Sequence, residues 1–343
     1  MKLVPPPERR MSMPANVNTG SLPDFIIGGA MKSATSSLHN LLATHNRVFI
    51  PDDEIHFFSI DDLIQHPPYF FGTVERRMDQ DYRRDFERNL RWYESFFEPA
   101  NDGQLIGEDS TAYLASPKAP GRIRELLPDV KLIFMLRNPV DRTYSHYWHR
   151  VRKGRAVNDF EHEIRYGSNN LHRRSFYKPQ LNRYLDTFPR AQVKVILFEE
   201  FVEETQRVVN DVCSFLGLQT TVSVEEASQH RNPSRVPYFF RFQLWMNRIT
   251  RDLDDFYERL LPGIQPASLG FWNQVQRSVF SRMQRWNLKE GSYPPMKEET
   301  RVHLSKIYGR ENRGLGEIVG TDFQDYWPCM REEVTLEAQK QIL

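Results

Sequence analysis

Short apolar runs that alternate with helix-like segments constrain the fold of this chain most. The clearest run, residues 131–136 (KLIFML), is apolar at successive positions, so a strand formed there has two buried faces. Residues 25–27 (FII) and 193–198 (VKVILF) have the same character, and a helical pattern follows each run. This alternation predicts an α/β fold: a doubly wound parallel sheet flanked by helices.

The chain length fits one large domain of this kind. We expect a disordered leader over 1–22, because three consecutive prolines and little apolar content leave nothing to pack. The domain is predicted over 23–328, with 236–328 forming a mostly helical cover, and 329–343 form a C-terminal tail. One helix is expected to end at Gly217.

Composition narrows the classes of partner. The formal net charge of +1 gives no reason to expect nucleic acid, and no run of about eighteen apolar residues encodes a membrane span. Neither of the two cysteines, Cys213 and Cys329, has metal-ligand spacing, and a free buried thiol at Cys213 indicates a reducing, cytoplasmic setting. Oligomeric state is not readable from the sequence.

The segment after the first apolar run has the composition of an anion-binding loop. It lies between a predicted strand and a predicted helix, where small residues let backbone N–H groups approach an anion. The cation and hydroxyl donors are Lys32, Ser33, Thr35, Ser36 and Ser37, with Ala34 among them. Met31 stands where the ordinary nucleotide loop has glycine before its lysine. A plain helix cap by Ser or Thr is the alternative.

A second candidate lies at the end of the clearest strand. Arg137 falls at its carboxyl end, where open α/β sheets place ligands, and Ser145 lies about two helical turns further on. Taken alone, these residues are better explained by a structural role, in which Arg137 pairs with a carboxylate and Ser145 merely packs.

Together the two segments resemble the signatures of the PAPS-dependent sulfotransferases, which use 3′-phosphoadenosine 5′-phosphosulfate (PAPS). Three further stretches resemble the branch that includes heparan sulfate N- and 3-O-sulfotransferases and bacterial relatives. Residues 54–58 (EIHFF) are similar to K-E-x-H-F-F, and residues 107–114 (GEDSTAYL) to G-E-K-[ST]-P-x-Y. Residues 177–216 run like the family's middle strand and helix.

The resemblance implies transfer of a sulfuryl group from PAPS to a hydroxyl or amine of a carbohydrate, lipid or small metabolite, without a metal. It assigns the donor's 5′-phosphosulfate to Lys32 and the loop from Ser33 to Ser37, and the 3′-phosphate to Arg137 and Ser145. Glu54 is the implied general base. His56 would orient Glu54 or share its proton; a structural histidine is the alternative, as a solvated turn acid is for Glu54.

Weaker matches extend the implied donor site. Tyr238 is positioned to contact adenine or the 3′-phosphate, and Lys289 matches a loop that closes over PAPS; a surface lysine is the alternative for Lys289. The aromatic stretch 238–245 serves either as an acceptor wall or as helix packing, and packing is favoured.

Three positions depart from the branch pattern. Ala34 stands where the family often has glycine, which requires a negative φ at this residue. Asp53 and Asp109 replace lysines, which argues against a polyanionic acceptor. The alternative function is a P-loop kinase or other nucleotide-binding protein, which would need glycine before Lys32.

Overall fold

A computed structural model describes residues 22–66, 86–167, 170–219, 222–224, 235–250 and 271–331. The predicted leader and most of the predicted tail lie outside these residues. Five parallel strands form the central sheet in the order β2-β3-β1-β4-β5. Their bounds are β1 Phe25–Gly29, β2 Val48–Phe49, β3 Leu105–Asp109, β4 Lys131–Leu136 and β5 Val193–Leu197.

The middle strands are buried on both faces, as the apolar runs predict. β1 pairs with β3 on one side and with β4 on the other, and β4 pairs in turn with β5. Along β4, Leu132 and Phe134 contribute to one core while Ile133 and Met135 contribute to the other. The predicted doubly wound α/β fold is therefore confirmed.

Helices cover both faces of the sheet. One face packs against α1 (Thr35–Ala43), α9 (Phe198–Glu203) and α10 (Thr205–Leu216). The other packs against α3 (Phe86–Ser95), α4 (Ala119–Leu126), α8 (Tyr177–Leu185) and α16 (Leu315–Val319). Gly217 ends α10 with φ 84°, in the left-handed conformation that glycine adopts without a Cβ penalty, as the sequence predicts.

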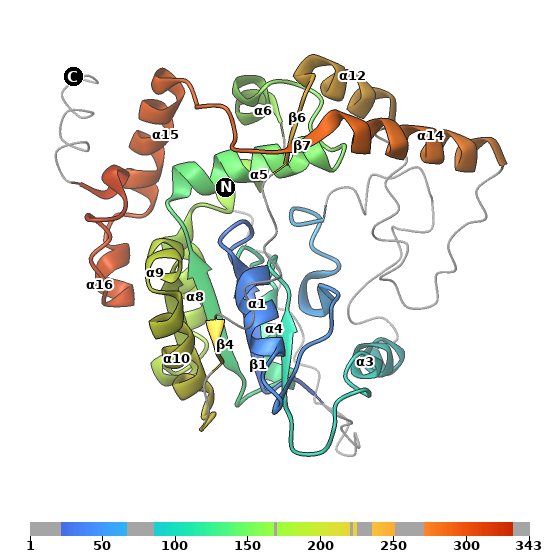
Figure 1. Cartoon of the computed structure of the whole chain (residues 1–343). Coiled ribbons are helices and arrows are strands. Elements are labelled where there is room, and N and C mark those ends of the chain that lie inside the picture. Colours follow the sequence, from blue (N-terminus) through green and yellow to red (C-terminus); the bar gives the residue numbers. More distant parts are fainter. Residues whose placement is uncertain are drawn as a thin grey trace, which may run out of the picture.

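A longer helix, α5 (Pro139–Arg152), lies across the upper end of the sheet, with β6, β7, α12 and α14 beyond it (Figure 1). The bounds of these elements are β6 Arg235–Pro237, β7 Leu288–Glu290, α12 Phe240–Thr250 and α14 Phe271–Asn287. The remaining elements are η1 Phe57–Ser59, α6 Phe160–Tyr166, α7 Asn170–Arg173, η3 Arg190–Gln192, α15 Glu298–Glu311 and η6 Pro328–Met330.

In the described part of 236–328, the helices α12, α14, α15 and α16 are accompanied by a short antiparallel ribbon of β6 and β7, which the sequence did not indicate. In the aromatic stretch 238–245, Phe240 packs against Trp148 of α5 with ring centroids 5.4 Å apart. Tyr238, Phe239 and Trp245 are exposed. Helix packing therefore explains only part of this stretch.

Candidate active site at the carboxyl edge of the sheet

The loop after β1 approaches its neighbours too closely for an ordinary side chain. Gly29 has φ 136°, and a Cβ there would lie 2.8 Å from the carbonyl oxygen of Thr111. Ala34 has φ 66°, so the expectation of a negative φ at this position is wrong. A non-glycine residue in this conformation costs about 1–2 kcal/mol. The loop is thus held in a conformation that its own side chains do not favour.

Helix α1 begins at this loop without a side-chain cap. Ala34 is the N-cap residue and makes no side-chain hydrogen bond to the first turn, so the alternative of a Ser or Thr cap is not observed. Uncapped N–H groups and the positive end of the helix dipole favour an anion here. The Ser33 hydroxyl is buried and has no hydrogen-bond partner in the described part of the chain.

Lys32 carries the positive charge of this loop. Burial, reinforced by the charges of Arg152 and Arg137, lowers the pKa of Lys32 to about 8, while the nearby Glu54 carboxylate acts in the opposite direction. A cation that is costly to desolvate among like charges is stabilised by an incoming anion. A phosphate or sulfate oxygen would therefore supply negative charge to Lys32 and a hydrogen-bond acceptor to Ser33.

Arg137 lies beside the same loop, at the end of β4. Its Nη1 donates to the carbonyl oxygen of Lys32 at 3.3 Å, and its guanidinium stacks over the ring of Phe198 at 4.4 Å. The Asn138 side chain caps α5 by accepting from the N–H of Val140. Ser145 is buried two turns along α5. The described contacts of Arg137 include no carboxylate, so the simple ion-pair alternative is not observed.

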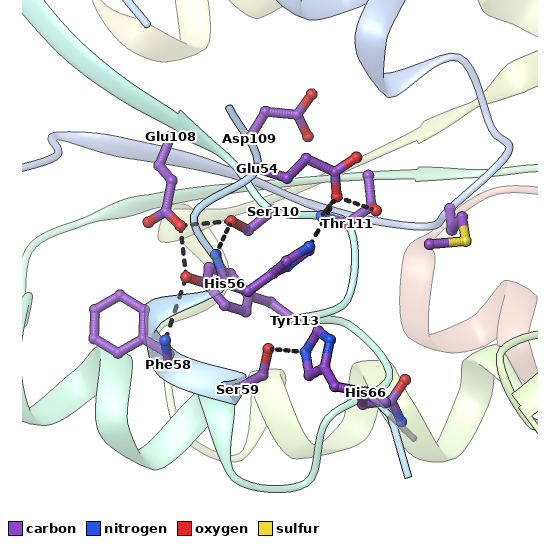
Figure 2. Close-up of polar contacts among 12 residues, drawn as sticks. Glu54, His56, Phe58, Ser59, His66, Glu108, Asp109, Ser110, Thr111 and Tyr113 are labelled. Atoms are coloured by element: carbon purple, nitrogen blue, oxygen red, sulfur yellow. Dashed lines mark hydrogen bonds and ion pairs between the residues drawn. The ribbon is translucent and has the colours of Figure 1, made fainter. Parts of the chain in front are cut away.

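Glu54 follows β2 and faces the loop that leaves β3. Its Oε2 accepts from the N–H of Thr111 at 3.2 Å and from the Thr111 hydroxyl at 2.7 Å. The Nε2 atom of His56 lies 3.5 Å from the same oxygen (Figure 2). Burial lowers the pKa of His56, so this histidine is neutral at pH 7. Glu54 is only partly exposed and is held by named partners, unlike a solvated turn acid.

The segment bearing Glu54 and His56 is also tied to a buried carboxylate. Glu108, at the end of β3, accepts hydrogen bonds from Ser110 at 2.6 Å, Tyr113 at 2.5 Å and Tyr93 at 2.6 Å. Burial raises the pKa of Glu108 to about 7, against the opposing effect of these hydroxyls. Ser110 in turn accepts from the N–H of His56. This cluster was not predicted from the sequence.

The next residue, Asp109, pairs with a helix rather than with Glu54. Its Oδ2 lies 3.5 Å from Nδ1 of His39 on α1. Burial raises the pKa of Asp109 to about 6. Asp53, the other residue that replaces a lysine of the branch, is exposed.

A cavity of about 210 Å³ opens beside Glu54. Its lining is rich in histidines and cations: Met31, Glu54, His56, Gln65, His66, Ala112, His146, His149, Arg150, Lys153, Arg155, Asn170 and Arg174. Burial lowers the pKa of all four of these histidines. These cations were not predicted from the sequence, although Arg150, Lys153 and Arg155 lie in a visible basic run, 150–155 (RVRKGR), that begins in the last turn of α5.

Two predicted donor ligands, Tyr238 and Lys289, lie together at the β6–β7 ribbon. The Lys289 ammonium lies over the Tyr238 ring at 4.9 Å, because β6 and β7 pair at this point. Within the described residues, neither side chain makes a hydrogen bond or ion pair to Lys32, Arg137 or Ser145. Tyr293, which follows β7, stacks on Trp148 of α5 at 5.6 Å. The ribbon is thus anchored to the helix that carries Ser145.

The described residues contain neither a membrane-spanning helix nor a metal-binding group. No helix among them is long and apolar enough to cross a membrane. In the same part of the chain, no three His, Cys, Asp or Glu side chains are grouped so that they could hold a metal ion.

The sheet and the loop between β1 and α1 define a P-loop-like α/β protein with polar groups gathered at the carboxyl edge of the strands. The model of the Sulfotransferase family matches residues 23–222, and the chain belongs to this family. A sulfotransferase from Alicyclobacillus acidocaldarius has a similar structure, with 36% identity, a TM-score of 0.50, and coverage of 68% of this chain and 93% of that one.

Curated relatives include two heparan sulfate enzymes. Human heparan sulfate glucosamine 3-O-sulfotransferase 6 is 29% identical over 208 residues, which are 59% of this chain and 54% of the relative. Mouse bifunctional heparan sulfate N-deacetylase/N-sulfotransferase 4 is 24% identical over 330 residues, 91% of this chain and 32% of the relative. The chain thus spans about half of the first relative's length and about a third of the second's.

Proposed function

We propose that this chain transfers a sulfuryl group from PAPS to a hydroxyl or amine of an acceptor. The observation that carries the proposal is the position of Glu54. It lines a cavity on one side and lies within electrostatic reach of Lys32, in the anion-binding loop, on the other. Family membership supports this function over the kinase alternative.

On the donor side, the proposal assigns the 5′-phosphosulfate to the start of α1. The uncapped N–H groups, the buried Ser33 hydroxyl and Lys32 supply donors and charge where negative charge develops on the leaving phosphate. Thr35, Ser36 and Ser37 add hydroxyls in the first turn. Arg137 and Ser145 are proposed to hold the 3′-phosphate, since a guanidinium supplies forked donors. Tyr238 and Lys289 remain proposed ligands from the ribbon.

On the acceptor side, Glu54 is proposed as the general base. As the acceptor oxygen or nitrogen attacks sulfur, its proton passes to a Glu54 carboxylate oxygen and the new bond to sulfur forms. The bond from sulfur to the bridging phosphate oxygen breaks, and its electron pair leaves on the 5′-phosphate of adenosine 3′,5′-bisphosphate. Thr111 and His56 fix the direction from which Glu54 accepts the proton.

The cavity beside Glu54 bears on the acceptor. Arg150, Lys153, Arg155 and Arg174 give its lining a positive character. This favours an acceptor that carries a carboxylate, sulfate or phosphate near the reacting group, in keeping with the heparan sulfate named for the mammalian relatives. The lysines lost at Asp53 and Asp109 are therefore compensated by cations from other segments.

The cysteines support the predicted cytoplasmic setting. Cys213 and Cys329 are both free and buried. Thiols that remain reduced are typical of a reducing compartment.

The test is incubation of the protein with PAPS and an acceptor library that includes anionic oligosaccharides. Mass spectrometry should detect addition of SO₃ to an acceptor and formation of adenosine 3′,5′-bisphosphate. The Lys32→Ala variant should lose transfer by roughly 10²–10³-fold, since one preorganised electrostatic contact to the transition state is removed. Lys297→Ala, at an exposed lysine paired with Glu161, serves as the control. Normal transfer by Lys32→Ala would contradict the assignment of the loop.

A further inference from the structure

The buried carboxyl of Glu108 is linked by hydrogen bonds to the segment that carries Glu54 and His56. Ser110 and Tyr113 both donate to the same oxygen, Oε1, whereas Tyr93 donates to Oε2. Glu108 itself is fully buried and does not line the cavity beside Glu54. It therefore does not contact an acceptor in that cavity directly.

Each of the two hydroxyls that donate to Oε1 also accepts a hydrogen bond. Ser110 Oγ accepts from the N–H of His56 at 3.0 Å, and Tyr113 Oη accepts from the N–H of Phe58 at 3.3 Å (Figure 2). A hydroxyl has one proton to donate. Since Oε1 takes that proton from both groups, their lone pairs are turned toward the two backbone N–H groups.

These hydrogen bonds hold a segment whose backbone includes a residue in an unfavourable conformation. His56 has φ 59°, a left-handed conformation that is uncommon for a residue with a side chain. The same loop holds Glu54 through Thr111, one residue after Ser110. The segment 54–58 is thus fixed by three successive contacts from the end of β3, and two of them depend on Oε1 of Glu108.

We propose that Glu108 is a positioning residue for the reaction: by orienting the hydroxyls of Ser110 and Tyr113, it fixes the backbone that presents Glu54 and His56 to the acceptor. This inference rests on the proposed function for its catalytic consequence. Its structural content, the ordering of the His56 and Phe58 amides, is independent of activity.

To orient the hydroxyls of Ser110 and Tyr113, the side chain at position 108 needs an acceptor oxygen but not a negative charge. A proton on Oε2 would face Tyr93 and leave Oε1 free to accept both hydroxyls. Glu108→Gln likewise offers a carbonyl oxygen toward Ser110 and Tyr113 and an amide toward Tyr93. Glu108→Met has similar length and no comparable acceptor, so it removes the orienting atom.

The experiment measures steady-state kinetics and amide hydrogen exchange of the full chain. For Glu108→Met we expect kcat to fall by about tenfold to a hundredfold, as a small misplacement of a reacting group does. The KM for PAPS should stay unchanged, and exchange at His56 and Phe58 should become faster. Glu108→Gln should restore kcat and the slow exchange. Equal kcat and equal exchange in Glu108→Met and wild type would overturn the proposal.

A matched pair of hydroxyl deletions tests the same point if Glu108→Met does not fold. Tyr113→Phe and Tyr93→Phe each remove one donor to Glu108. The Tyr113 hydroxyl also accepts from the N–H of Phe58, whereas Tyr93 contacts Phe57 and Phe58 through its ring, which the Phe variant keeps. Tyr113→Phe should lower kcat and speed exchange at Phe58, whereas Tyr93→Phe should do neither. Identical effects of the two variants would contradict positioning. If wild type transfers no sulfuryl group, the proposed function fails, while the exchange measurements still decide the role of Glu108.

Discussion

The loops that follow β1 and β3 lie side by side at the same edge of the sheet but are built in opposite ways. After β1, the Ser33 hydroxyl has no partner among the described residues, α1 has no side-chain cap, and the pKa of Lys32 is lowered among like charges. After β3, the hydroxyls of Ser110 and Thr111 are bonded within the protein.

This difference indicates whether the groups proposed for each half of the reaction are held by a bound ligand or by the protein itself. In the proposed function, anionic oxygens of the donor supply the partners that Ser33 and the first turn of α1 lack. On the other side, Thr111 and His56 already hold the carboxylate of Glu54, the proposed base, although His56 Nδ1 and Asp109 Oδ1 have no hydrogen-bond partner among the described residues. An unsatisfied buried hydroxyl lowers stability, and on the proposed assignment a bound anion would supply the partner that the Ser33 hydroxyl lacks.

The strongest test of this contrast removes the base alone. Glu54→Gln should lower kcat by roughly 10²–10⁴-fold, the usual contribution of a general base. Because Glu54 is not part of the donor loop, the affinity for adenosine 3′,5′-bisphosphate should stay close to that of wild type. Single-turnover kinetics and isothermal titration calorimetry measure the two quantities. Transfer by the variant at the wild-type rate would exclude Glu54 as the base.

Two substitutions, one in the loop after β3 and one in the loop after β1, test the same comparison with a smaller expected effect. Ser110→Ala removes bonds to Glu108 and His56 and should lower the free energy of unfolding by about 1–3 kcal/mol. Ser33→Ala removes a hydroxyl without a described partner, so stability should stay unchanged or rise by about 1 kcal/mol, while bisphosphate affinity falls. Chemical denaturation measures the first quantity and calorimetry the second. Equal destabilisation by both variants would remove the distinction between the loops.

Sequence reasoning reached the fold because apolar strands and helix boundaries are local signals. The resemblance to the sulfotransferases assigned Lys32, Arg137 and Glu54 to one site, and the three residues follow parallel strands, whose carboxyl ends meet at one edge of the sheet. Sequence reasoning did not give the φ of Ala34, which is set by the turn into α1. The Glu108 cluster was missed because Tyr93, fifteen residues before Glu108, reaches it only through the packing of α3.

The basic lining of the cavity was likewise not predictable from the sequence. Its basic lining combines side chains from α5, such as Arg150, with Arg174 from after α7, and their meeting depends on tertiary structure. The run 150–155 was visible, but nothing in its spacing indicated that it faces Glu54.

The most direct test of the central claim is a crystal structure with adenosine 3′,5′-bisphosphate bound. The account predicts the 5′-phosphate at the start of α1, within hydrogen-bond distance of Lys32 Nζ and Ser33 Oγ, and the 3′-phosphate on Arg137 and Ser145. Glu54 should keep its bonds to Thr111. Phosphates bound elsewhere, with Lys32 and Arg137 turned away from them, would contradict it.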